Sequence, residues 1–416
     1  MKRYDEYKDS GVEWIGEVPR HWEVVRTRYL CNLCTGNKDT INRVDDGKFP
    51  FYVRSPKVER INTYSFDGEA ILMAGDGVGA GKVFHYANGK FDYHQRVYNF
   101  HNFKKVIGKF FYYYITNNFR YIIEQGGAKN TVDSVRLYMI QNFLITVPPK
   151  EEQREIVFYL DKKCSEIDNV ISAQQKRIAL LQELKQSVIT HAVTKGLNPN
   201  VEMKDSGVEW IGKIPASWDV VHLKRILRER MQYGANEPAE SDDTTYPRYI
   251  RITDITANGE LRPETFKSLE PSTAKDYLLD KGDVLFARSG ATVGKTFLFN
   301  ADIKACYAGY LIKASCDKRR MLPEYLYYYT QSGAYECWKN SVFIQSTIQN
   351  IGADKYQMMY IPVPSKDEQK QIVEYTMRKS QIFDAAISKA QHQVELLQEY
   401  KQSLITEVVT GKRKVS

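Results

Sequence analysis

One stretch organises the whole chain: residues 148–196 read PPKEEQREIVFYLDKKCSEIDNVISAQQKRIALLQELKQSVITHAVTKG. A second version of it follows at 364–412 and reads PSKDEQKQIVEYTMRKSQIFDAAISKAQHQVELLQEYKQSLITEVVTGK. Both copies place apolar or small residues in alternating steps of four and three. That spacing indicates a heptad seam on a long helix that needs one partner helix.

The seam is the same in both copies, which are 364 − 148 = 216 residues apart. Lys185 interrupts it in the first copy, and Lys401 interrupts it at the same place in the second. We therefore expect the two helices to pair with each other. The residues predicted to pair are Leu160, Ile167, Ile171, Ile178, Leu181 and Val188 in the first copy, and Phe383, Ile387, Val394, Leu397 and Leu404 in the second.

The ends of both stretches carry helix signals. Acidic residues fill the first turn of the first copy, and Ser365 with Glu368 fits a capping box at the start of the second. Gly196 and Gly411 are expected to end the two helices. At about 1.5 Å per residue, roughly 40 helical residues span about 60 Å, which is the length of a spacer rather than of an average globular helix.

A second repeat opens each half of the chain. DSGVEWIG stands at 9–16 and again at 205–212, an offset of 205 − 9 = 196. The two repeats together predict the order globular unit, helix, globular unit, helix. The expected segments are a first unit at 1–147, a helix at 148–196, a linker at 197–204, a second unit at 205–363, a helix at 364–412 and a basic tail at 413–416.

The two globular units have few residues in common but keep the same order of features. Short runs such as AILMA, RVYNF, DVLFA and KTFLF, separated by Gly, Asn and Asp, are typical of strands. Helices are expected at 108–123 and 322–337. The fold class is therefore α+β, with two similar, mainly-β units.

Composition is that of a globular protein: 43% of the 416 residues are hydrophobic and 26% are charged. The 59 basic and 51 acidic residues give a mildly basic chain, which permits a polyanionic partner without requiring one. No apolar run is long enough for a signal peptide or a membrane span, so we expect a cytoplasmic protein. The six cysteines are scattered, and the pair at Cys31 and Cys34 has no second pair at zinc-site spacing, so free thiols, mostly buried, are expected.

The run GATVGKT at 290–296 resembles a phosphate-binding loop but does not fit one. Such a loop has four residues between its first glycine and Gly-Lys, and here there are three. In the first half Asp76 stands where that glycine is needed, and Lys82 is followed by valine. We expect a glycine-rich turn between strands, with its lysine directed to a DNA phosphate.

Motifs for catalysis are also missing. The Pro148-Pro149 pair is not part of an amino-methyltransferase motif, and none of the seven histidines is placed for metal or triad chemistry. The sequence therefore predicts a non-catalytic chain that binds no cofactor or metal itself. Arginines near turns or strand ends can place a forked guanidinium on guanine or phosphate. The candidate DNA contacts are Arg54, Lys82, His94, Arg96, Lys129, Asn130, Arg251, Arg288, Lys295, Gln345 and Ser346, although for His94 a hydrogen-bonded strand histidine is the favoured alternative.

With both DSGVEWIG openings, both Gly-Lys turns and the EEQREI and DEQKQI helix starts, the chain resembles the specificity subunits of type I restriction-modification systems over essentially its full length. The resemblance implies two target recognition domains, each reading half of a bipartite DNA site, and conserved helices that pair antiparallel. It also implies two modification subunits that use S-adenosylmethionine on adenine N6, and restriction subunits that use ATP and Mg²⁺.

The repeats support this picture independently of the family. The second helix begins at the unit that lies beyond the end of the first, so the simplest packing of the two seams is an antiparallel coiled coil with pseudo-twofold symmetry. A coiled-coil adaptor that binds only proteins is the alternative interpretation, but it does not explain the duplicated and diverged globular units. An NTPase or a methyltransferase would need a complete motif.

Overall fold

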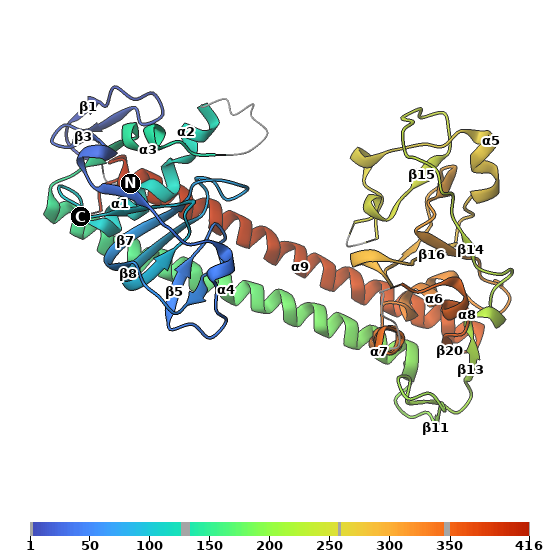
Figure 1. Ribbon diagram of the computed structural model, residues 1–416. Coiled ribbons are helices and arrows are strands. Elements are labelled where there is room, and N and C mark those ends of the chain that lie inside the picture. The colour runs from blue at the N-terminus through green and yellow to red at the C-terminus, as the bar shows by residue number, and fades with distance from the viewer. Residues whose placement is uncertain (1–2, 126–133, 257–258, 345–349, 416) are drawn as a thin grey trace. The chain divides into compact units, whose positions relative to one another are not determined.

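The structure is a computed structural model that describes residues 3–125, 134–256, 259–344 and 350–415 (Figure 1). Four candidate DNA contacts, Lys129, Asn130, Gln345 and Ser346, lie outside the described residues. The chain forms two compact units. Unit 1 comprises Met1–Gln175 and His392–Ser416, and unit 2 comprises Lys176–Gln391. Each unit therefore contains part of each repeated helix.

The two repeated stretches are single long helices. Helix α4 runs over Lys150–Lys195 and α9 over Lys366–Val409, close to the expected limits. Gly196 and Gly411 follow them with φ of 76° and 75°, the left-handed conformation that commonly ends a helix. The capping box at the start of α9 is also formed, because Ser365 N donates to Glu368 Oε2 over 3.2 Å and Glu368 N donates to Ser365 Oγ over 3.3 Å.

Unit 1 is built on a six-stranded sheet, in the order β4-β9-β7-β8-β5-β6. All neighbouring strands are antiparallel except β5 and β8, which are parallel. A separate pair joins β3 to β10 directly before α4, and a β1/β2 hairpin opens the chain. The strands are β1 Tyr7–Asp9, β2 Glu17–Pro19, β3 Glu23–Arg26, β4 Asn32–Thr35, β5 Phe49–Tyr52, β6 Glu59–Ile61, β7 Phe66–Ala74, β8 Phe84–Tyr93, β9 Val97–His101 and β10 Leu144–Val147; the helices are α1 Gly108–Asn118, α2 Arg120–Gln125 and α3 Leu137–Asn142.

Unit 2 repeats this plan with shorter strands. Its main sheet has the order β14-β19-β16-β17, and β15 pairs in parallel with β18 as β5 does with β8. Strands β13 and β20 pair directly before α9. The strands are β11 Met203–Asp205, β12 Lys213–Pro215, β13 Asp219–His222, β14 Gln232–Tyr233, β15 Arg248–Ile250, β16 Val284–Ala287, β17 Thr296–Leu298, β18 Ala305–Tyr307, β19 Leu311–Ala314 and β20 Tyr360–Val363; the helices are α5 Pro271–Ala274, α6 Pro323–Tyr329, α7 Gly333–Ile344 and α8 Ala353–Gln357.

The helices expected at 108–123 and 322–337 are each divided in two. In unit 2 the break follows Tyr329, where Ser332 Oγ accepts a hydrogen bond from Tyr335 N and caps the next helix. Gly333 N donates to Thr190 Oγ1 of α4 over 2.7 Å. A tertiary contact with the long helix thus accompanies the division of a helix that looks continuous in the sequence.

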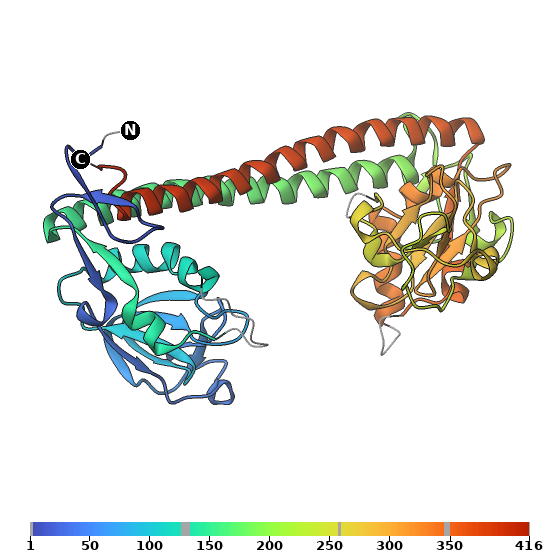
Figure 2. The same ribbon diagram turned by 90° about the horizontal axis from the view of Figure 1, so that it is seen from above.

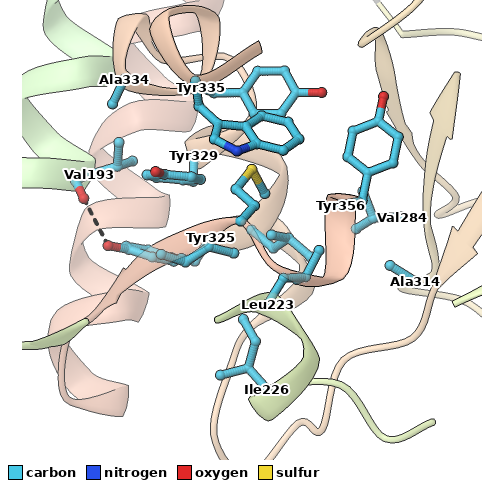
Figure 3. Packing of buried hydrophobic residues seen from close by; sticks show 14 of the residues in the cluster. Val193, Leu223, Ile226, Val284, Ala314, Tyr325, Tyr329, Ala334, Tyr335 and Tyr356 are labelled. Carbon is cyan, nitrogen blue, oxygen red and sulfur yellow. Dashed lines mark hydrogen bonds between the residues drawn. The ribbon is translucent and has the colours of Figure 1, made fainter. Parts of the chain in front are cut away.

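Tyrosine-rich segments form the cores of both units rather than their surfaces. In unit 2, Tyr325, Tyr329, Tyr335 and Tyr356 have no exposed side chain (Figure 3). Tyr325 Oη donates to the carbonyl of Val193 over 3.0 Å, which connects α6 to the last turn of α4. Buried phenols of this kind need a partner for their hydroxyl group, and here the backbone supplies it.

Within each unit, the parts of α4 and α9 lie side by side and run in opposite directions (Figure 1 and Figure 2). In unit 1, Leu160 of α4 and Leu404 of α9 belong to one buried cluster. Every residue predicted to pair is buried or half-buried, while most of the residues between them are exposed. The antiparallel coiled coil expected from the heptads is therefore present in each unit.

The same lysine–aspartate ion pair occurs once within each unit, with the lysine on α9 in unit 1 and on α4 in unit 2. Lys401 Nζ lies 2.7 Å from Asp168 Oδ1 in unit 1, and Lys185 Nζ lies 2.7 Å from Asp384 Oδ1 in unit 2. Since 168 + 216 = 384 and 185 + 216 = 401, these are the same contact made twice. The lysines that interrupt both seams thus have a matching carboxylate on the opposite helix.

Candidate nucleic-acid interface

In unit 1 the segments that follow β5, β7 and β8 converge on one carboxylate. Asp76 Oδ1 accepts a hydrogen bond from Arg54 Nη1 over 2.9 Å, and Asp76 Oδ2 lies 3.7 Å from Arg96 Nε. A cleft of about 230 Å³ lies beside them and is lined by Arg96, Tyr98 and Arg136, among others. The structure therefore brings Arg54 and Arg96, two of the predicted DNA contacts, onto a shared partner.

The buried side chain of His94 fixes the backbone of Arg96 in this cluster. Its side chain is buried, and its Nδ1 accepts a hydrogen bond from the backbone N–H of Arg96 over 2.9 Å. The proton of the neutral ring therefore sits on Nε2, which lies 3.7 Å from Asp39 Oδ2. Burial, and then the positive charge of Arg54, lower the pKa of His94 below its ordinary value. This residue positions Arg96, as the alternative of a hydrogen-bonded histidine anticipated.

The two Gly-Lys turns have the same geometry. Gly81 has a φ of 61° and donates to the carbonyl of Ala74 over 2.8 Å, while Gly294 has a φ of 82° and donates to Ala287 over 2.9 Å. Each turn joins two antiparallel strands, whereas a nucleotide-binding loop leads from a strand into a helix. Both lysines, Lys82 and Lys295, are exposed.

Unit 2 places different side chains at equivalent backbone positions. Arg288 N donates to the carbonyl of Tyr310 over 3.0 Å, just as Gly75 N donates to that of Arg96 over 2.8 Å. Arg288 therefore corresponds to Gly75, and Tyr310 to Arg96. The Arg288 guanidinium lies 4.9 Å from the centre of the Tyr233 ring, and Tyr310 is 65% exposed. An arginine stacked on an aromatic ring takes the place of the arginine–aspartate cluster.

Arg251 differs from the other candidates, because its guanidinium is already bound within the protein. Its Nη2 and Nε donate to the two oxygens of buried Asp254 over 2.7 and 3.0 Å, and Nη2 also donates to the carbonyl of Thr265 over 2.8 Å. This bidentate pair fixes the segment after β15. The structure thus assigns Arg251 a role in loop geometry and leaves it without the outward fork that base contact requires.

Lys295 lies at a second cleft, of about 220 Å³, behind the turn of unit 2. Its polar lining includes Gln331 and Lys339, and its apolar lining includes Phe297 and Leu311. Sequence reasoning missed Lys339, Arg136, Tyr310 and Asp76 as candidates. For Asp76 a signal existed, since this acidic residue breaks a glycine-rich turn, but only the fold shows that two arginines converge on it.

Neither a metal site nor a membrane helix is found in the described part of the chain. No group of three or more His, Cys, Asp or Glu residues there could hold a metal ion. None of the helices in the same residues is long and apolar enough to cross a bilayer. All six cysteines are free, and four of them are buried, as predicted. Cys31 is buried and Cys34 is exposed.

Comparison with known proteins adds independent information. The family model described as the type I restriction modification DNA specificity domain matches residues 19–180 and 215–395. The chain belongs to this family. Each match covers one globular unit's sheet and most of the helix that follows it in the sequence, so the specificity domain occurs twice, as the repeats predicted.

Relatives of this specificity chain match over most of its length. The type I restriction enzyme EcoDI specificity subunit of Escherichia coli is 22% identical over 375 residues, covering 86% of this chain and 81% of that protein. The MjaVIII specificity subunit of Methanocaldococcus jannaschii is 23% identical over 419 residues, covering 96% and 94%. A chain in a solved structure of the type I R-M system superimposes with a TM-score of 0.67 at 17% identity, covering 94% of this chain and 98% of that one. The chain therefore shares its fold with a chain of a known type I R-M system.

Proposed function

We propose that the chain is the sequence-specific DNA-binding subunit of a type I restriction-modification complex and that each unit reads one half of a bipartite, asymmetric site. The observation that carries this proposal is the pair of equivalent loop positions. Backbone hydrogen bonds match Gly75 and Arg96 of unit 1 with Arg288 and Tyr310 of unit 2, yet the side chains differ. A shared scaffold with different side chains at its loop tips suits two readers of different sequences.

Catalysis in this proposal belongs to other subunits. A modification subunit would supply S-adenosylmethionine chemistry on adenine N6, and a restriction subunit would use ATP and Mg²⁺. The chain would bind no cofactor itself and would position the modification subunits on DNA. The purified chain alone is then expected to transfer no methyl group, and methyl transfer that persists after contaminating methyltransferase has been removed would contradict this division of labour.

Two modification subunits are expected because the same exposed apolar pair occurs twice. Leu180 and Leu184 on α4 are 55% and 45% exposed, and Leu396 and Tyr400 on α9 are 50% and 49% exposed. Since 180 + 216 = 396 and 184 + 216 = 400, these are equivalent positions. Each pair is spaced by one helical turn, which is the spacing that a partner helix uses. Replacing one pair by glutamates should reduce the number of bound modification subunits from two to one, as measured by the mass of the complex.

A domain exchange tests the proposal directly. Residues 205–363 are replaced by the corresponding unit of another specificity subunit, the complex is expressed with its modification subunit, and the methylated motif is read from genomic DNA. One half-site should change and the other should persist. An exchange confined to α9 serves as the matched control and should leave both half-sites unchanged. A chimera that alters both halves, or a native complex without any sequence preference, would favour the protein-binding adaptor instead.

A further inference from the structure

The arginine–aspartate cluster of unit 1 has the geometry of a base reader. Arg96 is anchored on both sides of its backbone, because its N–H donates to His94 Nδ1 over 2.9 Å and its carbonyl accepts from Gly75 N over 2.8 Å. Its side chain is 65% exposed, and its Nε faces Asp76 at 3.7 Å. The end edge of a guanidinium, formed by one N–H from each of Nη1 and Nη2, points away from Nε, so a contact through Nε leaves that edge available. Those two donors have the spacing of the O6 and N7 acceptors of guanine.

Asp76 is held in place for this task by a second arginine. Arg54 Nη1 donates to Asp76 Oδ1 over 2.9 Å, so the carboxylate is oriented by one arginine while it faces the other. Asp76 lies after β7, Arg54 after β5 and Arg96 after β8, so the three residues come from separate segments of one sheet. A carboxylate at this position also repels the DNA backbone, which argues against a cluster that serves only as a phosphate anchor.

We propose that Arg96 is a base-reading residue of unit 1, that Asp76 is its positioning residue, and that the pair selects a guanine in one half-site. The inference rests on the proposed function, because it assigns residues to a half-site that unit 1 reads. In unit 2 the equivalent positions carry Ser289 and Tyr310, so this guanine preference belongs to unit 1 alone.

The test compares three variants in the full complex with the modification subunit. Arg96→Lys keeps the charge but loses the fork, and Asp76→Ala removes the carboxylate that orients it. Asp45→Ala is the matched control, because it removes the same charge from the same unit at a carboxylate that is 90% exposed and lies 3.7 Å from Arg43. Binding is measured to a library of duplexes randomised at one position at a time, and each variant is first shown to unfold at the native temperature.

Arg96→Lys should lose roughly 10- to 100-fold discrimination at a single guanine, while its affinity for unrelated DNA changes little. Asp76→Ala should lose discrimination at the same guanine. It should bind unrelated DNA at least as tightly as Asp45→Ala does. Asp45→Ala should retain the native motif.

Two results would overturn the inference while leaving the proposed function intact. One is that the native complex recognises a bipartite motif and the Arg96→Lys variant still discriminates every guanine in it. The other is a uniform loss of affinity in that variant for every sequence, which identifies a phosphate contact. A native complex without a bipartite motif would instead refute the proposed function itself, so the two failures are distinguishable.

Discussion

At the scale of single residues, repeated contacts show which side chains hold the long helices to the sheets. Trp22 Nε1 donates to Glu152 in unit 1, and Trp218 Nε1 donates to Glu368 in unit 2. Each tryptophan also lies against the glycine that ends the other long helix, Trp22 beside Gly411 and Trp218 beside Gly196. The opening of each half is thus fastened to the start of one helix and to the end of the other.

Gly411→Ala should destabilise unit 1 by more than its backbone conformation alone predicts. An L-residue at its φ of 75° costs about 1–2 kcal/mol, and the new Cβ would also lie 2.2 Å from Cδ of Pro19. Gly16→Ala is the control, because Gly16 has a φ of 68° and no atom near the added Cβ. Thermal unfolding of both variants separates strain from the clash. Equal losses would show that Pro19 moves aside.

His94 should make the stability of unit 1 dependent on pH. Its pKa is lowered in the folded chain, so the unfolded chain takes up its proton at a higher pH, near the ordinary value of about 6.5. The His94 contribution to the free energy of unfolding is therefore constant above about pH 7 and falls as the pH drops below about 6.5.

The matched variant is His94→Asn, which keeps an acceptor close to the position of Nδ1 but cannot be protonated. Its free energy of unfolding should fall less than that of the native chain between pH 7.5 and 5.5. The difference between the two pH profiles isolates His94 from the other histidines. Parallel profiles would mean that protonated His94 is accommodated, for instance by Asp39.

At the scale of elements, apolar seams pair α4 with α9, and the charged residues in those seams favour one register and direction of pairing. Lys185 and Lys401 stand in mainly apolar series, and each meets an aspartate of the other helix. An isolated lysine at a seam position costs stability, whereas a paired one favours the register and direction that supply its partner. Partly exposed ion pairs contribute little energy, so their main effect is on specificity of pairing.

A double-mutant cycle on the unit 2 pair tests this role. Lys185→Asp should destabilise unit 2 because it places two carboxylates together, and adding Asp384→Lys should recover most of the loss. The coupling energy expected for the native pair is about 0.5–1 kcal/mol. The unit 1 pair, Lys401 with Asp168, provides the internal control and should be unaffected. A double variant no more stable than Lys185→Asp would mean that the pair does not set the register.

At the scale of the whole molecule, the boundary between the units is itself repeated. It falls after Gln175 in α4 and after Gln391 in α9, and 175 + 216 = 391. Both helices are continuous through these points, since α4 covers Lys150–Lys195 and α9 covers Lys366–Val409. These are the positions at which both helices can be lengthened together without altering the contacts inside either unit.

Inserting four residues after both Gln175 and Gln391 should lengthen each helix by about 6 Å and leave its apolar face nearly unrotated. Because B-DNA rises about 3.4 Å per base pair, the favoured spacer between half-sites should grow by one or two base pairs. Both half-site sequences should persist. The motif methylated in cells is the measurement.

Two-residue insertions at the same positions are the control. They rotate each helix by about 200°, displace the seam and should abolish assembly with the modification subunits. Four residues inserted into α4 alone should give a weaker spacer shift, because local unwinding absorbs an unmatched turn. An active double four-residue variant with an unchanged spacer would show that the helices do not set the distance.

The sequence by itself determined the architecture, because helices and repeats are recorded in local pattern. Heptad spacing predicts the pairing faces of α4 and α9, since a seam that must stay on one face restricts every third or fourth position. The capping signals and the terminal glycines predict the ends of both helices to within three residues. The DSGVEWIG opening repeats at an offset of 196 residues and the long helix at an offset of 216, so the sequence predicts that the second globular unit is larger than the first. The spacing of GATVGKT excludes a phosphate-binding loop. Each of these conclusions needs only residues that are near one another in the chain or repeated along it.

Only the tertiary structure decided which polar side chains are available for recognition. Arg54, Asp76 and Arg96 meet because three strands end beside one another, and nothing in their spacing along the chain records that. Arg251, which follows β15 as Arg54 follows β5, is held by Asp254 three residues further on. A guanidinium is a base reader or a structural clamp according to which carboxylate the fold brings to it, because a fork occupied within the protein cannot also meet a guanine.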